Sequence, residues 1–268
     1  MPVIHRNGLV VDVIDEGSGP PIVLAHSSVS GNRQWKRLIE LLKPRYRVLA
    51  PNLFGYGQTT PWTVDGTQTL RDAAEVLLAV ADGIDGPLRL VGHSWGGGVA
   101  LRAASVLGDR VSHLAVFEPM VPFLLKAHGR TEAAAEARAL RDDVKRFGGT
   151  RAWEALARRF IDFFNGDGAW AAMPEDRRRL VVAQIQPNYY EWDSIDEPET
   201  ARLFATVTAR TLLMRCAAGR LVTHDTIEVL REAFPRWSFV EVGEGGHMAP
   251  LSRPDLVNPV LSAFLDTV

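Results

Sequence analysis

The sequence predicts an α/β fold with a mostly parallel central sheet flanked by helices. Short apolar runs and amphipathic helical segments alternate through the first 119 residues and again after residue 205. This alternation is typical of parallel strands joined by helices that cover both faces of a sheet. The 268 residues are enough for one large domain with an insertion.

The first half of the predicted sheet is read from apolar runs between turn residues. Residues 9–16 alternate in polarity, so we expect an antiparallel edge strand there, followed by a glycine- and proline-rich turn. The next expected elements, in chain order, are a buried strand at 21–25, a helix at 35–42 ended by Pro44, a strand at 47–50, a helix at 70–80, a strand at 88–91, a helix from 98 and a strand at 113–117.

The alternation stops after Pro119. Residues 120–205 are rich in alanine and arginine, have helical periodicity, and are too many for a loop in a compact domain. We therefore expect a helical cap at 120–205, inserted after the strand that ends at Phe117, with the core formed by 1–119 and 206–268. The core resumes with a strand at 211–215, a helix at 226–234, a strand at 238–242 and a final helix from about 254.

The stretch Gly92-His93-Ser94-Trp95-Gly96 lies between a predicted strand and a predicted helix. A serine on such a tight turn is held exposed at a helix N-terminus, where free N–H groups can stabilise an oxyanion. The flanking glycines let neighbouring backbone pass closely without Cβ clashes. This context predicts that Ser94 is a catalytic nucleophile.

The same glycines also fit a dinucleotide-binding loop. Gly92, Gly96 and Gly98 match a G-x-x-x-G-x-G spacing, as in short-chain dehydrogenases. Such a loop normally follows the first strand of the fold, and those enzymes carry a Tyr-x-x-x-Lys pair. None of the four tyrosines has a lysine four residues on, so we favour the nucleophile interpretation.

A serine hydroxyl needs a base to take its proton, and His247 is the best placed histidine. It follows the last predicted strand in the loop Gly243-Glu244-Gly245-Gly246-His247, ahead of the closing helix. His26 and His93 each end a strand beside the proposed nucleophile and are expected to be structural. The remaining histidines, with no motif around them, are His5, His113, His128 and His224.

Three motifs in order along the chain resemble those of the α/β-hydrolase superfamily, in particular its esterase-like members with a serine nucleophile. They are Leu24-Ala25-His26-Ser27-Ser28, Gly92-His93-Ser94-Trp95-Gly96-Gly97 and Gly246-His247-Met248-Ala249-Pro250-Leu251. The resemblance implies an oxyanion hole made by the backbone N–H groups of Ser28 and Trp95. One departure is Ser27, where the superfamily usually has glycine.

A second departure concerns the acid that orients the histidine. The superfamily most often places it shortly after the strand at 211–215, a position that Gly219 occupies here. Asp225 is the nearby alternative acid, although it reads as a helix cap or first-turn residue. Glu118 ends the preceding strand, where certain haloalkane dehalogenases carry their acid; those enzymes also have a tryptophan after the nucleophile, like Trp95. We expect Glu118 to be the third catalytic residue.

The nucleophile type predicts the reaction class. Dehalogenases and epoxide hydrolases of this fold use aspartate, whereas Ser94 favours acyl chemistry. We therefore expect a carboxylesterase-like serine hydrolase acting through an acyl-enzyme on a small or medium apolar ester, thioester, lactone or C–C bond. The alternative is a ligand-binding or receptor-like pseudo-hydrolase, which the missing acid at Gly219 would favour.

The expected partner is a small-molecule substrate, in a pocket formed by the cap aromatics Tyr189, Tyr190 and Trp192. The resemblance implies no cofactor, and no metal site is expected. A net charge of −2 gives no basic surface for nucleic acid, and no apolar run approaches membrane-spanning length. No signal-peptide pattern is present and Cys216 is the single cysteine, so we expect a cytoplasmic protein; the sequence leaves monomer and homodimer open.

Overall fold

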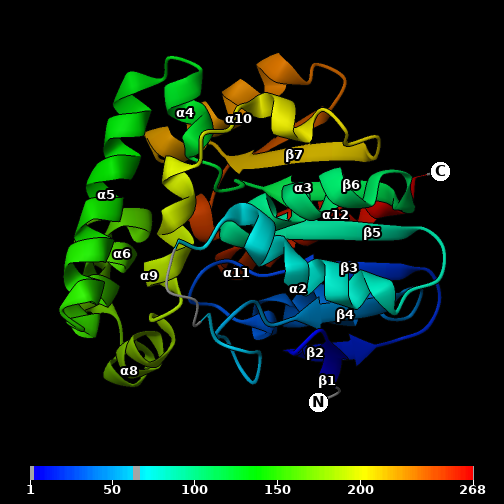
Figure 1. Ribbon diagram of the computed structural model, residues 1–268, viewed down its shortest axis with the longest axis horizontal. Helices are drawn as coiled ribbons and strands as arrows, with labels where there is room; N and C mark the ends of the chain where they lie inside the picture. The colour runs from blue at the N-terminus through cyan, green and yellow to red at the C-terminus, as the bar shows by residue number, and fades with distance from the viewer. Residues whose placement is uncertain (1–2, 63–66, 268) are drawn as a thin grey trace.

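An eight-stranded sheet runs through the molecule (Figure 1). The computed structural model describes residues 3–62 and 67–267; residues 1–2, 63–66 and 268, which belong to the predicted core, lie outside the described residues. The strand order is β1-β2-β4-β3-β5-β6-β7-β8. The strands are β1 Val3–Arg6, β2 Leu9–Glu16, β3 Pro21–Ala25, β4 Arg47–Pro51, β5 Leu88–His93, β6 Val111–Phe117, β7 Arg210–Cys216 and β8 Ser238–Val242.

The sheet confirms the predicted mostly parallel α/β fold. Strands β3 to β8 pair in parallel, and β2 pairs antiparallel with β4 and with β1. The prediction that residues 9–16 form an edge strand is wrong, because β1 covers their outer side. Since all the parallel strands end at one edge, the residues that follow β5, β6 and β8 are brought together there.

Helices cover both faces of the sheet (Figure 1). Buried side chains of α2 and α3 form one apolar layer, and those of α1 and α12 form the other. Thr69 begins α2 with a capping box to Asp72, which satisfies two N–H groups that the first turn leaves free. The core helices are α1 Lys36–Leu42, α2 Leu70–Asp82, α3 Trp95–Leu107, α10 Leu221–Ala233, α11 Ala249–Ser252 and α12 Pro254–Leu265, with 3₁₀ turns at Asn32–Trp35, Gly108–Arg110 and Gly246–Met248.

Helices also fill the segment between the end of β6 and the start of β7. This segment lies beside the edge where the parallel strands end (green to yellow in Figure 1). Its own apolar core includes Leu140, Phe160 and Phe163, and Val222 of α10 joins that core from the sheet side. Its helices are α4 Phe123–Ala127, α5 Thr131–Gly149, α6 Trp153–Asn165, α7 Ala169–Ala172, α8 Glu175–Gln184 and α9 Asn188–Glu191, with 3₁₀ turns at Trp192–Asp196 and Ala201–Phe204.

No helix within residues 3–62 and 67–267 combines the length and the apolar character needed to cross a membrane.

Candidate active site

Ser94 sits at the sharp turn between β5 and α3. Its φ of 54° and ψ of −123° are unfavourable for a residue with a side chain, so neighbouring contacts must hold this conformation. Its N–H donates to the Phe117 carbonyl at 2.9 Å, and its own carbonyl accepts from the Met120 N–H at 2.9 Å. The turn is therefore anchored on both sides to the end of β6, the strand that precedes Glu118.

Gly96 lets this turn approach β3. A Cβ at position 96 would lie 2.3 Å from the His26 carbonyl oxygen and 2.4 Å from that of Ala25. Both obstacles are backbone atoms, which cannot rotate out of the way as a side chain can. The glycine that the G-x-S-x-G pattern marked is therefore required by space at this position, and it brings α3 against the end of β3.

The structure brings Ser94, His247 and Glu118 into one buried chain of hydrogen bonds. The Ser94 hydroxyl lies 2.9 Å from His247 Nε2, and His247 Nδ1 lies 2.6 Å from Glu118 Oε2. A carboxylate accepts from Nδ1–H, which leaves Nε2 as the acceptor for the serine hydroxyl. The side chains of His247 and Glu118 are 3% and 0% exposed, so water competes little for these bonds.

Glu118 is held by the neighbouring strand β7. Its N–H donates to the Met214 carbonyl at 2.8 Å, and its Oε1 accepts from the Cys216 N–H at 2.9 Å. Its φ of 41° turns the chain away from the sheet directly after β6. Both carboxyl oxygens have a donor, which offsets the loss of hydration on burial.

His93 positions the backbone of His247. Its Nδ1 lies 3.1 Å from Gln34 Nε2, an atom that can only donate, so the His93 proton is on Nε2. That Nε2–H donates to the His247 carbonyl at 2.8 Å. Burial drives the pKa of His93 well below its usual range, with a smaller contribution from His247, so the ring stays neutral. The expectation of a structural role fits this geometry.

Gln34 also forms hydrogen bonds with Ser27, the serine that replaces the usual glycine. Its Oε1 accepts from the Ser27 N–H at 2.9 Å and from the Ser27 hydroxyl at 2.8 Å. On the other side of this loop, the His26 Nδ1–H donates to the Ser27 carbonyl at 2.8 Å, and burial lowers the pKa of His26 to about 4. The loop that carries Ser28 is thus fixed by hydrogen bonds to a side chain on each side.

The two residues expected to form the oxyanion hole with their N–H groups are Trp95 and Ser28. Trp95 is the first residue of α3, where N–H groups have no partner within the helix. Ser28 precedes Val29, which has a φ of 64° and donates its N–H to the Tyr56 hydroxyl at 2.9 Å. Ser28 and Trp95 both line the same cavity as Ser94.

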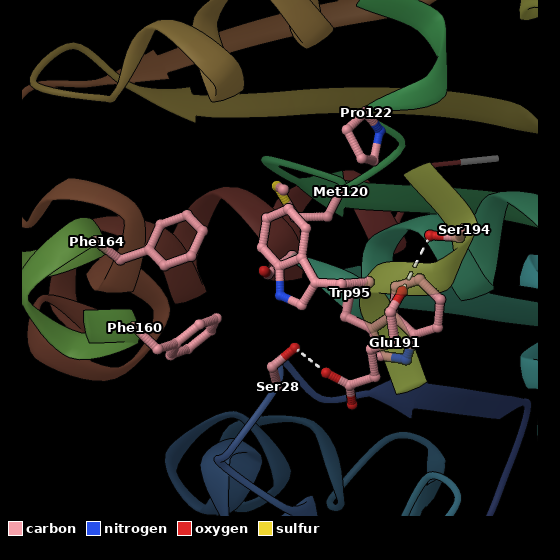
Figure 2. A pocket seen from close by; sticks show the side chains of 10 residues that line it. Ser28, Trp95, Met120, Pro122, Phe160, Phe164, Glu191 and Ser194 are labelled. Carbon is pink, nitrogen blue, oxygen red and sulfur yellow. Dashed lines mark hydrogen bonds between the residues drawn. The ribbon is translucent and has the colours of Figure 1, made fainter. Parts of the chain in front are cut away.

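That cavity is mostly apolar. Figure 2 shows Phe160 and Phe164 of α6 on one side, Met120 and Pro122 above, and Ser28 with Glu191 below. Phe164 also stacks on the His247 ring, with centroids 4.3 Å apart. The lining residues are Ser28, Ser94, Trp95, Met120, Pro122, Phe160, Phe164, Glu191, Trp192 and Ser194.

Two of the three aromatics predicted for the pocket lie elsewhere. Trp192 lines the cavity, as expected. Tyr189 packs against Gly148, with the Lys145 ammonium 3.8 Å from its ring centroid. Tyr190 lines a separate hollow beside Phe54. The short helix α9 thus points neighbouring residues to different sides, a rotation that the sequence pattern did not specify.

Glu118, and not Asp225, is the hydrogen-bond partner of His247 Nδ1. Helix α10 begins at Leu221, earlier than predicted, so Asp225 lies in its second turn and the capping position is Arg220. The expected capping role is therefore wrong. At Gly219, even a Cβ would lie 2.9 Å from side-chain atoms of His224 and Thr223, so a larger side chain would need those residues to move.

Glu191 is one of the cavity residues that the sequence analysis missed, and the only one of them with an acidic or basic side chain. It is buried, and its Oε1 accepts from the Tyr56 hydroxyl at 2.9 Å. Its Oε2 accepts from the Ser28 hydroxyl and from the Asn188 side-chain amide, the latter at 3.2 Å. Burial raises the pKa of Glu191 to about 7, although these donors oppose the shift. The only sequence signal was a lone carboxylate in the aromatic run Tyr189-Tyr190-Glu191-Trp192.

The protein's class follows from a family comparison together with this fold. A family model described as "Alpha/beta hydrolase family" matches residues 22–260. The chain therefore belongs to the alpha/beta hydrolase family, and the resemblance inferred from its motifs is confirmed.

Within the described residues, no group of three or more potential metal ligands was found.

The individual proteins that this chain is similar to share a low percentage of identical residues with it, or match only part of it. The chain is 24% identical to a haloalkane dehalogenase from Agrobacterium fabrum, over 97% of this chain and 90% of that protein. It is 38% identical to Lipase LipV from Mycobacterium tuberculosis, but that match covers only 39% of this chain and 39% of the lipase. The crystal structure of an enol-lactonase from Burkholderia xenovorans LB400 superposes with a TM-score of 0.80 at 18% identity, covering 99% of this chain and 100% of that one.

The raised pKa of Glu191 predicts a pH-dependent stability. The folded state favours the protonated carboxyl, so this stabilisation is full below the ordinary pKa of 4.5 and is lost as the pH rises towards about 7. Glu191→Gln cannot ionise. Between pH 5 and pH 8, its unfolding free energy should therefore gain about 2 kcal/mol relative to that of the natural protein.

Urea unfolding at both pH values measures this difference. Asp196→Asn is the matched control, because Asp196 is an exposed carboxylate in the same segment, paired with Arg138 and Arg141. The control should show no comparable gain. Parallel pH profiles for Glu191→Gln and the natural protein would contradict the raised pKa.

Proposed function

We propose that the protein is a serine hydrolase that cleaves a small or medium apolar ester, thioester, lactone or C–C bond through an acyl-enzyme. The observation that carries this proposal is the buried hydrogen-bonded chain from the Ser94 hydroxyl through His247 to Glu118. A serine at a strained turn, a histidine within reach of its proton and an acid behind that histidine are what nucleophilic acyl transfer needs.

Acylation would begin with attack by Ser94 Oγ on the substrate carbonyl carbon. The hydroxyl proton passes to His247 Nε2, and Glu118 stabilises the positive imidazole. The N–H groups of Ser28 and Trp95 donate hydrogen bonds to the carbonyl oxygen and stabilise the negative charge that develops on it. Collapse of this intermediate breaks the bond to the leaving group, which takes its proton from His247.

Deacylation repeats these steps with water. His247 takes a proton from a water molecule as it attacks the acyl-enzyme, and the same oxyanion donors stabilise the second intermediate. Breaking the bond to Ser94 Oγ releases the carboxylic acid, and the serine recovers its proton from His247. The space beside Ser94 is lined by Trp192, Phe160 and Phe164. We propose that these side chains limit the size of the substrate.

The relatives are named for several different reactions, and the residue at position 94 distinguishes between these reactions. A serine forms an acyl-enzyme, which favours the lipase and lactonase type of chemistry over dehalogenation or epoxide opening. The alternative of a ligand-binding protein without turnover depended on the absence of an acid at Gly219. The Glu118 carboxylate, 2.6 Å from His247 Nδ1, is the observation that favours the enzyme over this alternative.

Ser94→Ala removes the proposed nucleophile. We expect kcat for hydrolysis of a p-nitrophenyl ester to fall by up to about 10⁶-fold, the scale known for loss of a serine nucleophile. A fluorophosphonate should label the natural protein at Ser94 and leave the variant unlabelled in mass spectrometry. Labelling at another residue, or activity retained in Ser94→Ala, would contradict the proposal.

Glu118→Gln tests the proposed acid. It keeps the size of the side chain but removes the charge that stabilises the imidazolium, so kcat should fall by about 10⁴-fold. Asp225→Asn is the control, and it should leave kcat within about threefold because Glu118, and not Asp225, is the partner of His247 Nδ1. Unchanged melting temperatures of both variants would exclude unfolding as the cause of a lower kcat. A larger loss in Asp225→Asn than in Glu118→Gln would reverse the assignment.

A further inference from the structure

Glu191 is the one acidic or basic side chain among the described residues that line the Ser94 cavity. Most of the wall around it is apolar, from Met120, Pro122, Phe160 and Phe164. A carboxyl in such surroundings is expensive to bury, and burial already shifts its pKa upward. Apolar surface alone therefore does not explain a glutamate at this position.

The carboxyl is fixed in place and still has room to accept. A carboxylate offers about four acceptor positions, and Tyr56, Ser28 and Asn188 fill three of them. Oε2 takes two of these donors and Oε1 takes only one, from Tyr56. Figure 2 shows Glu191 on the cavity floor with its hydrogen bond to Ser28. By this count one acceptor position remains on the Glu191 carboxylate, which lines the cavity.

Its place relative to the proposed chemistry is also defined. Ser28 is the residue whose N–H we assign to the oxyanion hole, and the hydroxyl of the same residue donates to Glu191. The Ser28 side chain therefore links the Glu191 carboxyl to the backbone N–H that would bind the substrate carbonyl. An acyl group attached at that carbonyl would meet Glu191 within a few bonds of the reacting carbon.

We propose that Glu191 selects the acyl group: it accepts a hydrogen bond from a neutral donor, such as a hydroxyl or amide N–H, and excludes acyl groups that carry a carboxylate. This inference rests on the proposed function, because it assumes that an acyl group occupies this cavity. Lysine and arginine are absent from the described lining residues, so a substrate carboxylate would find no cation there. At pH 8 a carboxyl with a pKa of about 7 can take up a proton to admit a substrate carboxylate, so charge repulsion slows such a substrate by on the order of tenfold. The hydrogen bond that a neutral donor gives to the charged carboxylate adds about another tenfold to the preference.

Three methyl esters of similar length test the selection at pH 8, with hydrolysis followed by proton release. Methyl succinamate carries a neutral donor, methyl butyrate carries neither donor nor charge, and monomethyl succinate carries a carboxylate. We expect kcat/KM of the natural protein to fall in that order, with succinamate preferred over succinate on the order of 100-fold.

Glu191→Gln keeps an acceptor oxygen but removes the charge. In this variant the preference for succinamate over succinate should shrink to less than about tenfold, through faster hydrolysis of the succinate ester. Asp196→Asn removes a charge from the same segment outside the cavity and should keep the preference of the natural protein.

Each outcome has a distinct meaning. Equal hydrolysis of the succinate and succinamate esters by the natural protein overturns the inference without any variant, and so does an unchanged preference in a folded Glu191→Gln. Hydrolysis of none of the three esters, together with no fluorophosphonate labelling of Ser94, overturns the proposed function and this inference together.

Discussion

The hydrogen bond between Glu118 and His247 joins residues 129 positions apart, and it can form only after the sheet is assembled. β6 must pair with β7 so that the Cys216 N–H reaches Glu118, and the loop after β8 must return to the same edge with His247. Removing either partner would leave a buried polar group without its bond, which is far more destabilising than losing the same bond at a surface. Stability and proposed catalysis therefore depend on the same contact.

A second set of hydrogen bonds holds the histidine from behind. Gln34 accepts from Ser27 and donates to His93, and His93 donates to the carbonyl of His247. Each bond fixes the direction of the next, so the tautomer of His93 follows from its contact with Gln34, while burial keeps the ring neutral. Ser27, which departs from the usual glycine of the family, is thus part of a chain that connects the oxyanion loop to the proposed base.

The sequence predicted the parallel sheet, the Ser94 turn and Glu118, because each follows from local pattern or from a motif with a defined place in the fold. The sequence analysis was wrong about where one helix begins and about which way the side chains of another helix point. α10 begins at Leu221 rather than near 226, which moves Asp225 out of the first turn, and the rotation of α9 turns Tyr189 and Tyr190 away from the cavity. Glu191 belongs to no motif; its role depends on burial against Ser28 and Tyr56, which are far away in the sequence.

Proton NMR of the protein labelled with ¹⁵N-histidine tests the central contact most directly. A proton shared between His247 Nδ1 and a buried carboxylate should give a resonance far downfield, coupled to an imidazole nitrogen and slow to exchange with water. We expect this resonance to disappear in Glu118→Gln and to remain in Asp225→Asn. A resonance that survives in a folded Glu118→Gln, or that is lost in Asp225→Asn, would contradict the assignment of Glu118 as the residue that holds His247.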